Sequence, residues 1–444
     1  MVSGTQDFSL SKNEKEKITS VVETTHSHKR LHDPKEIGIE LLLFYCSYRA
    51  LISFLLFDFQ PIVLVVTSLF AIYNILFKRT LTSLNRTIVI FLLLNWVYII
   101  VNGLLFFKKE TFIKGITQYI LFLLIIFISC NGLQITIIKR LLKYLVFINI
   151  PNALGSIFET ITKRYILPNS HYQFNDDGMI RTAAFNGDMI ALPIILGICV
   201  MICIYYFSRN KKLLYLSLSF LFFIAAVASQ SRGPLVAIMV SLVITFIMYN
   251  NSKNKGSLSP TVIGRILSIC LLFLLFYILV VETNIFSNTP LAHFAQRIRT
   301  IFVWDNSNGD HSNASRILIW GFWIKQFTLH PLLGQGIGVT GSDLDVTKGA
   351  TESAVLKRLV ELGAIGTVIN ITMLVLIIVH SINTIKRADE KNKMLYCTIF
   401  SFLIMMCIEG LVLQIDEYYT ATTVVWLFTP ILFSRNKEQM GVMQ

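Results

Sequence analysis

The sequence predicts an all-α polytopic membrane protein with about twelve transmembrane helices, and three observations lead to that class. The chain is 54% hydrophobic and only 15% charged, whereas soluble domains carry roughly 25% charged residues. Its apolar runs recur at lengths near the ~20 residues that cross a bilayer as a helix. The runs are continuous rather than alternating, which favours helices over barrel strands, because a helix satisfies its own backbone hydrogen bonds in lipid.

The order of the apolar runs gives the predicted organisation of the chain. Residues 1–36 form a polar segment of mixed sign without the apolar core of a signal peptide, so we expect it to be disordered. A loop far longer than any other break separates the ninth predicted span from the tenth. The predicted spans are 37–57, 61–77, 87–107, 115–130, 139–158, 188–207, 213–229, 233–250, 262–282, 364–380, 393–413 and 418–434.

Basic residues give the predicted orientation. The formal net charge is +13, but most Lys and Arg residues lie in short loops beside apolar runs, which indicates orientation in a membrane rather than binding to nucleic acid. An N-terminus inside the cell places these loops and both termini in the cytoplasm. The predicted parts are a cytoplasmic segment (1–36), nine transmembrane helices (37–282), an external loop with amphipathic helices (283–363), three transmembrane helices (364–434) and a cytoplasmic tail (435–444).

The run 317–333 is apolar enough to suggest a thirteenth span. A crossing there would move the basic residues that follow the tenth span to the outside, against the positive-inside tendency. Lys325 within the run also disfavours a crossing. We therefore expect the run to lie along the membrane interface or to re-enter the membrane.

Five arginines are predicted to face outward, against the same tendency, and their concentration indicates a bound anion. Arginine suits phosphate because its planar fork donates two parallel hydrogen bonds and stays charged. The alternative is that each arginine merely extends toward lipid head groups. They are Arg181 before the sixth span, Arg232 in the turn between the seventh and eighth spans, and Arg316, Arg297 and Arg299 in the long loop.

Two residues of the long loop are candidate proton-transfer groups. Glu352 is predicted to head a helix with an apolar stripe through Val355 and Leu356, so its carboxylate would lie along the packed face and act as a general base. Alternatively, it complements the helix dipole. His330 precedes Pro331 and a glycine-rich turn, where it either transfers protons near neutral pH or ends a helix as a cap.

The sequence predicts neither a metal nor another cofactor. Asp343-Leu344-Asp345 has the Asp-x-Asp spacing with which many nucleotide-sugar transferases hold a metal, but three residues often match by chance. The seven cysteines all lie within or at the end of predicted spans, without a Cys-x-x-Cys pair. We therefore expect them to be packing residues rather than disulfide partners or metal ligands.

Further charged residues lie within the predicted helices. Arg49 in the first span and Glu409 in the eleventh are costly in an apolar helix, so each marks a candidate functional site. Both are positioned to reach an external cavity, and the alternative for each is an interhelical charge pair or an extension to the interface. Glu361 follows Lys357 by four residues, which is typical of a surface ion pair on a helix.

Several short motifs lie on the predicted external side, and none of them is specific alone. They are Arg181 with Phe185-Asn186-Gly187-Asp188, Ser231-Arg232-Gly233, Arg316 with Trp320, His330-Pro331-Leu332-Leu333-Gly334 with Gly336, and Glu361-Leu362-Gly363 with Gly366. In order, spacing and common side, the stretch of roughly residues 180–370 resembles the bacterial O-antigen polymerase and ligase superfamily.

The resemblance implies an inverting, metal-independent glycosyltransferase of the membrane-embedded, GT-C-like type, located at the periplasmic face of the inner membrane. Such enzymes of lipopolysaccharide and polysaccharide biosynthesis use undecaprenyl-pyrophosphate-linked oligosaccharides as donors and work with a flippase and a chain-length regulator. The outward arginines would then hold the pyrophosphate and stabilise the charge that grows on it as the sugar departs.

One departure from the family pattern favours the polymerase branch. Ligases carry His-Asn, or a near variant, nine residues before the Gly-x-x-G that ends the lid helix. Here Glu352-Ser353 occupies that place before Gly363-Ala364-Ile365-Gly366, and polymerases often carry an acid there. The expected reaction transfers the growing glycan from one lipid carrier to the non-reducing end of a repeat unit on another.

Other classes of function stay open at this stage. An O-antigen ligase would transfer the glycan to the lipid A core instead. A lipid-linked oligosaccharide flippase should have short loops and charges in mid-membrane cavities, and a solute transporter should have inverted repeats with broken helices in matching positions. The one long external loop fits the enzyme better than either of these.

Overall fold

The fold is known for most of the chain from a computed structural model that describes residues 34–57, 59–77, 84–129, 134–167, 180–253, 312–340 and 350–433. These residues form helices joined by turns, with no β-strand among them. Eight of their helical stretches are long and apolar enough to cross a membrane. The predicted class, an all-α polytopic membrane protein, is therefore confirmed.

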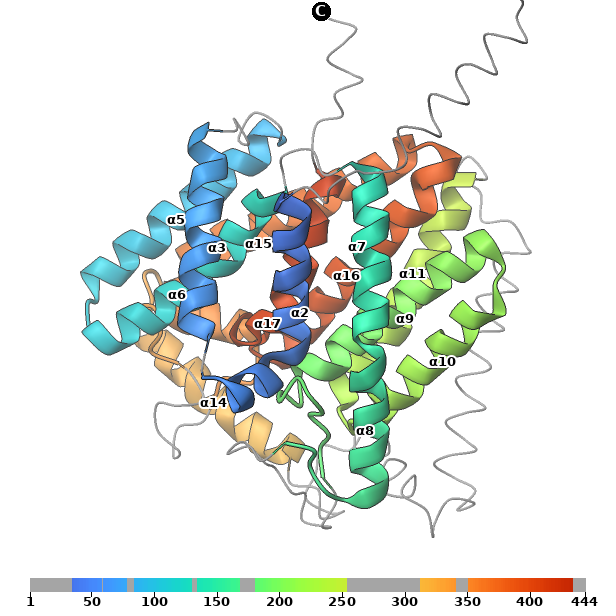
Figure 1. Ribbon diagram of the computed structural model, residues 1–444. Coiled ribbons are helices and arrows are strands. Elements are labelled where there is room, and N and C mark those ends of the chain that lie inside the picture. The colour runs from blue at the N-terminus through green and yellow to red at the C-terminus, as the bar shows by residue number, and fades with distance from the viewer. Residues whose placement is uncertain are drawn as a thin grey trace, which may run out of the picture. The chain divides into compact units, whose positions relative to one another are not determined.

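The described helices follow the predicted spans closely (Figure 1). Two apolar helices are shorter than the eight long ones, and they coincide with the predicted spans 213–229 and 418–434. The helices are α2 (Pro34–Leu55), α3 (Gln60–Phe77), α5 (Arg86–Leu105), α6 (Lys109–Ser129), α7 (Ile135–Ile148), α8 (Ile150–Thr162), α9 (Ala191–Asn210), α10 (Leu213–Ala228), α11 (Arg232–Lys253), α14 (Ser312–Leu329), α15 (Ala354–Arg387), α16 (Glu390–Val412), η3 (Ile415–Glu417), α17 (Tyr419–Phe428) and η4 (Thr429–Leu432).

Some predicted boundaries differ from the observed ones. The first helix begins at Pro34, within the segment that was expected to be disordered, and α15 extends well beyond the predicted span 364–380 in both directions. The predicted span 139–158 is two helices that meet at Asn149, next to Pro151. Helix α14, which covers most of the run 317–333, is not among the eight candidate spans. The predicted span 262–282 lies outside the described residues.

The chain divides into two compact units, Met1–Leu42 and Leu43–Gln444, and the candidate site belongs to the second. Within that unit α9 is the most thoroughly buried of the candidate spans and packs against α10, α11, α16 and α17 (Figure 1). Helix α15 packs against α5, α14 and α16. Helices α9 and α15 therefore both pack against α16, the helix that carries Glu409.

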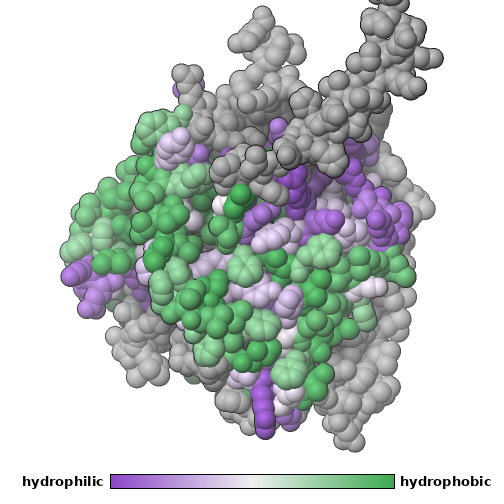
Figure 2. Space-filling model, in the orientation of Figure 1, coloured by the Kyte–Doolittle hydropathy of each residue, from purple (hydrophilic) through white to green (hydrophobic). Residues whose placement is uncertain are grey.

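Large apolar side chains are exposed on the outer helices. Helix α3 exposes Val65, Val66, Leu69 and Leu76, and much of the described surface in Figure 2 is hydrophobic. An exposed apolar surface of this kind is expected of a helix that faces lipid, because lipid tails are as apolar as these side chains.

Helix α15 is broken at Gly363, and a loop from elsewhere in the chain fills the break. Gly363 has φ 67° and ψ −175°, a conformation that glycine adopts without steric cost. The backbone groups released there bond to residues 331–336 instead of to their own helix. The replacement bonds run from Ala364 N to Pro331 O (2.8 Å), Ile365 N to Leu332 O (3.3 Å), Gln335 N to Val360 O (2.8 Å) and Gly336 N to Glu361 O (3.1 Å).

The contact at this break is close enough to require glycine on both sides. A Cβ built on Gly363 would lie 2.2 Å from the Leu332 carbonyl oxygen, and one on Gly334 would lie 2.4 Å from the Glu361 carbonyl oxygen. The Tyr98 hydroxyl donates to a further released carbonyl, that of Leu362, at 2.8 Å. Irregular backbone of this kind is tolerated in a membrane bundle when its polar groups are satisfied inside the protein.

Helix α2 is broken in the same manner at Tyr48, which has φ −123° and ψ 27°. There the segment around Asn186 fills the break, since its side chain donates to Cys46 O at 2.7 Å. The Asn152 side chain donates to Ser47 O at 2.9 Å. The backbone bonds that complete the joint run from Ala50 N to Asn186 O (3.3 Å) and from Leu51 N to Phe185 O (3.2 Å).

Candidate functional site

The candidate site is built from four separate segments of the chain. At the start of α14, Arg316 Nε lies 3.2 Å from Glu352 Oε2, and both side chains are about a third exposed, at 29% and 31%. The segment before α9 contributes Arg181, whose Nη2 donates to Ser231 Oγ at 3.4 Å. Ser231 immediately precedes Arg232, the first residue of α11. We call Arg181, Arg232, Arg316 and Glu352 the arginine site.

The charges of the arginine site act on one another. Burial lowers the pKa of the Arg181 guanidinium, Tyr418 and Glu352 raise it, and the like charge of Arg316 lowers it again. These residues form a partly shielded group of positive charges, which is a suitable environment for a phosphate group.

The segment that carries Arg181 is fixed by the side chains of α8. Glu159 Oε2 accepts hydrogen bonds from Ala183 N at 2.9 Å and Ala184 N at 3.0 Å, and Ser156 and Thr182 are hydrogen-bonded at 2.6 Å. A carboxylate that accepts several backbone N–H groups holds the chain firmly in one conformation. Arg181 is therefore presented from a rigid loop.

The interpretation of Glu352 as the first residue of a helix was wrong. Helix α15 begins at Ala354, and Ser353 is its N-cap, accepting from Leu356 N at 3.4 Å. Glu352 precedes the cap with φ 53°, in the left-handed region that non-glycine residues rarely occupy. Such strain is typical of functional sites. Its carboxylate faces Arg316 rather than the apolar stripe of the helix, and it is not placed in the first helical turn.

Glu409 lies next to the turn that carries Arg232. Its side chain is fully buried near the end of α16, and a Cβ built on Gly233 would stand 2.9 Å from its Oε2. The Arg316 charge also acts on this carboxylate. Of the two candidate cavity charges, Glu409 thus belongs to the surroundings of the arginine site.

Arg49 makes different contacts. Its Nη2 donates to Gln60 Oε1 at 3.1 Å, and its guanidinium carbon lies 5.0 Å from the centre of the Tyr419 ring. The Tyr419 hydroxyl is hydrogen-bonded to that of Tyr45 at 3.1 Å. A guanidinium over an aromatic face is favourable in a desolvated place, and this cluster adjoins the arginine site through Tyr418, the neighbour of Tyr419 in sequence.

His330 follows the last residue of α14, where its N–H bonds to Phe327 O at 3.1 Å and its carbonyl accepts from Gly334 N at 2.9 Å. The side chain is exposed, with the ring 6.5 Å from that of Phe106, edge-on. No contact given for the described residues joins His330 to the arginine site. This place at the end of a helix matches the capping alternative. Arg297, Arg299 and Asp343–Asp345 lie outside the described residues.

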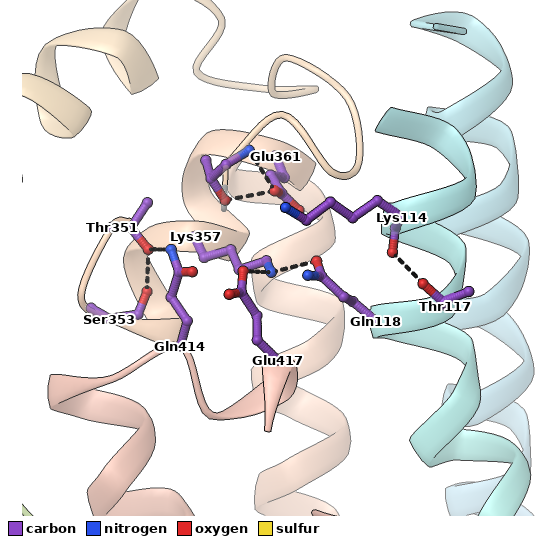
Figure 3. A network of polar contacts seen from close by, with 10 residues as sticks. Lys114, Thr117, Gln118, Thr351, Ser353, Lys357, Glu361, Gln414 and Glu417 are labelled. Carbon is purple, nitrogen blue, oxygen red and sulfur yellow. Dashed lines mark hydrogen bonds and ion pairs between the residues drawn. The ribbon is translucent and has the colours of Figure 1, made fainter. Parts of the chain in front are cut away.

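The expectation of a surface ion pair between Lys357 and Glu361 was wrong, because both side chains are fully buried. Lys357 Nζ instead donates to Gln118 Oε1 at 2.6 Å and to Glu417 Oε1 at 2.9 Å. Glu361 Oε1 accepts from Thr340 N at 2.9 Å and from Thr340 Oγ1 at 2.6 Å. Figure 3 shows these contacts joining α6, α15 and η3, with the Lys114 side chain pointing toward Glu361.

The polar network of Figure 3 includes Thr351 and Ser353, the residues on either side of Glu352. Thr351 donates to Ser353 O at 2.9 Å and is hydrogen-bonded to Gln414, so the residues on either side of Glu352 are held in place. Glu417 precedes Tyr418, so the Lys357 ion pair also positions that phenol. The sequence pattern hides this role, because a lysine and a glutamate four residues apart suggest a solvated helix face.

We expect Glu417→Gln to lower the free energy of unfolding by about 3 kcal/mol, because it leaves the Lys357 charge buried without a counter-charge. The matched control is Glu110→Gln, at an exposed acid in the first turn of α6, which should cost less than about 1 kcal/mol. Thermal denaturation of the purified protein in detergent compares the two. Equal losses of stability would contradict the role assigned to the buried pair.

Two further residues of the site region were not identified in the sequence. Glu159 lies one residue beyond the predicted fifth span, and an acid in that place is itself a signal, since a carboxylate at the end of an apolar helix needs a partner. Tyr418 gave no signal, because an aromatic residue at a span end is ordinary in membrane proteins. The described cysteines, Cys46, Cys199, Cys203, Cys397 and Cys407, are all free thiols.

Comparison with known proteins gives the family. Residues 217–371 match the model of a family described as O-antigen ligase. A curated O-antigen polymerase of Salmonella muenchen is 26% identical over 309 residues, which cover 64% of this chain and 73% of the relative. The chain is therefore similar to proteins of the O-antigen polymerase and ligase superfamily. The matched region contains Arg232, Arg316 and Glu352, whereas Arg181 and Glu409 lie outside it.

These two similarities confirm the resemblance noted in the sequence. The structure also gives the motifs of that resemblance a physical role. The His-Pro-Leu-Leu-Gly motif and the Glu-Leu-Gly motif meet at the break in α15, and the Phe-Asn-Gly-Asp motif fills the break in α2. These motifs therefore hold the helices that present the arginines.

Proposed function

We propose that this protein is an O-antigen polymerase, a glycosyltransferase that extends a surface polysaccharide. In the proposed reaction, the growing glycan leaves undecaprenyl pyrophosphate and joins the non-reducing end of a second lipid-linked repeat unit. The reaction takes place at the periplasmic face of the inner membrane, with both termini of the chain in the cytoplasm. It inverts the anomeric configuration and uses no metal.

The observation that carries the proposal is the grouping of Arg181, Arg232 and Arg316. Arg181 bonds to the residue before Arg232, and the Arg316 charge acts on Arg181, although the three come from distant parts of the sequence. Guanidinium groups aimed at one place stabilise a diphosphate most when its charge grows, as happens when the bond to the sugar breaks. A donor with a pyrophosphate leaving group fits this arrangement.

The acceptor hydroxyl attacks the anomeric carbon from the side opposite the pyrophosphate. Its proton passes to a nearby carboxylate, and the electron pair of the broken C–O bond leaves with the pyrophosphate. Glu352 and Glu409 are carboxylates beside the arginines, whereas Asp188 Oδ1 accepts from the backbone N–H groups of Ile190 and Ala191. Holding both lipid-linked substrates in this pocket turns their encounter into a step within one complex, which itself accelerates the reaction.

The second candidate is an O-antigen ligase, which the printed description of the matched family favours. The pair Glu352-Ser353 where ligases carry His-Asn favours the polymerase, as does the name of the Salmonella muenchen relative. Both enzymes would use the same donor and the same arginines. They differ in the acceptor, which is a lipid-linked repeat unit for the polymerase and the lipid A core for the ligase.

Deletion of the gene in its own bacterium tests the proposal. Loss of a polymerase should leave the surface glycan at one repeat unit, whereas loss of a ligase should strand long chains on the lipid carrier. Gel electrophoresis of the surface polysaccharide distinguishes these patterns, and a plasmid copy of the gene should restore the ladder. A deletion strain with a wild-type ladder would refute both. Cysteines placed at positions 181, 232 and 316 should all be accessible to labelling from the periplasm. The expected protein partners of the enzyme are a flippase and a chain-length regulator.

A further inference from the structure

Glu409 is a fully buried carboxylate without a hydrogen-bond partner on either oxygen. Buried carboxylates are normally satisfied, as Glu159 is by backbone N–H groups of the Arg181 segment, because an unpaired buried charge is costly. An unsatisfied carboxylate in a native fold calls for a functional reason.

The surroundings of Glu409 supply such a reason. A Cβ built on Gly233 would lie 2.9 Å from Oε2 and 3.0 Å from Oε1, so the carboxylate is in direct contact with the turn that carries Arg232. Only glycine allows this approach without displacing either the turn or the carboxylate. Arg316, on another helix, acts on the same group. The carboxylate therefore lies beside the turn that carries Arg232 and within the electrostatic reach of Arg316.

Glu352, the other acid at the site, is differently engaged. Its Oε2 is 3.2 Å from Arg316 Nε, and its side chain is 31% exposed. One of its two oxygens is therefore occupied by the guanidinium. Glu352 thus orients Arg316, whereas Glu409 has both oxygens available for a proton.

We propose that Glu409 is the catalytic base, an inference that rests on the proposed glycosyltransferase function. The acceptor O–H gives its proton to the Glu409 carboxylate while its oxygen forms the new bond to the anomeric carbon. The C–O bond to the pyrophosphate breaks, and its electron pair leaves with the undecaprenyl pyrophosphate. The protonated Glu409 then returns its proton to water as the product leaves.

The test compares Glu409→Gln with Glu390→Gln in purified protein reconstituted with lipid-linked repeat units. Glu390 is an exposed acid at the opposite end of the same helix, so its variant should polymerise at the wild-type rate. Glu409→Gln should lose about 100-fold or more in the initial rate, the contribution of a general base. Its affinity for undecaprenyl pyrophosphate, measured with labelled product, should stay within about threefold of wild type, a factor worth less than ~1 kcal/mol.

Chemical rescue separates catalysis from structure. Glu409→Ala opens space for a small base, and sodium formate should restore part of its rate, whereas no rescue is expected for Arg316→Gln. Gly233→Ala provides a second variant that keeps the carboxylate and displaces it, so its rate should also fall. Polymerisation by Glu409→Gln at half the wild-type rate or more would overturn the inference and leave the proposed function intact. Failure of the wild-type protein itself to polymerise the lipid-linked units would instead refute the proposed function.

Discussion

Replacing Arg316 with glutamine will lower the rate of polymerisation by roughly 100-fold to 1,000-fold, the usual effect of removing one preorganised donor from a developing negative charge. The substitution removes a guanidinium from the proposed pyrophosphate site and also releases Glu352 from its 3.2 Å contact. The initial rate with lipid-linked repeat units measures the effect, with membrane abundance as the normalisation. Arg316→Lys keeps the charge but loses the planar fork, so its rate should be intermediate.

The matched control for Arg316→Gln is Arg164→Gln. Arg164 is an exposed arginine after α8, outside the arginine site, and its variant should keep the wild-type rate within about twofold, less than ~0.5 kcal/mol. Equivalent losses in the two variants would indicate that overall positive charge, rather than the arginine site, attracts the substrate. Retention of more than half the activity in Arg316→Gln would contradict the assignment of Arg316 to the pyrophosphate.

Replacing Gly363 with alanine will destabilise the protein by about 3 kcal/mol or more, because the left-handed backbone is strained for other residues and the contact is overpacked. The added Cβ would lie 2.2 Å from Leu332 O and 2.5 Å from Gly334 N. Both are backbone atoms, which cannot rotate away as a flexible side chain would. The joint between α15 and residues 331–336 should open, and the arginine site with it.

Gly321→Ala is the control for Gly363→Ala. Gly321 lies in the middle of α14, and a Cβ there would meet nothing within 4 Å, so alanine should be neutral or stabilise the helix by up to about 1 kcal/mol. Membrane abundance and the midpoint of thermal denaturation in detergent report both effects. Normal stability of Gly363→Ala would show that the joint relaxes easily and does not hold the site.

The pattern of long apolar runs was sufficient to predict the helices, because membrane insertion depends on local composition. The eleven predicted spans that fall on described residues all coincide with helical stretches. The sequence did not reveal the breaks at Tyr48 and Gly363. A break in a helix is stable only when another segment satisfies the released backbone groups, and that segment is distant in sequence: residues 185–186 in one case and 331–336 in the other.

Candidate residues could be selected from the sequence more easily than their roles. Arg181 and Arg316 stood out because arginine is rare on the external side of a membrane protein. The periodicity of apolar residues gave a wrong position for Glu352, because the predicted helix began at Glu352 whereas the observed helix begins at Ala354. It failed again for Lys357, because helical spacing shows which residues share a face but not whether another element covers that face.

The sequence by itself was sufficient to identify an α-helical membrane protein and to predict outward arginines suited to a phosphate, since composition and charge placement are local properties. Tertiary structure alone decided that Arg181 bonds to the turn of Arg232, that Glu352 engages Arg316 and that Glu409 lies unpaired behind Gly233. These contacts depend on how distant helices pack, and the free energy of packing is shared among residues that no window of sequence brings together.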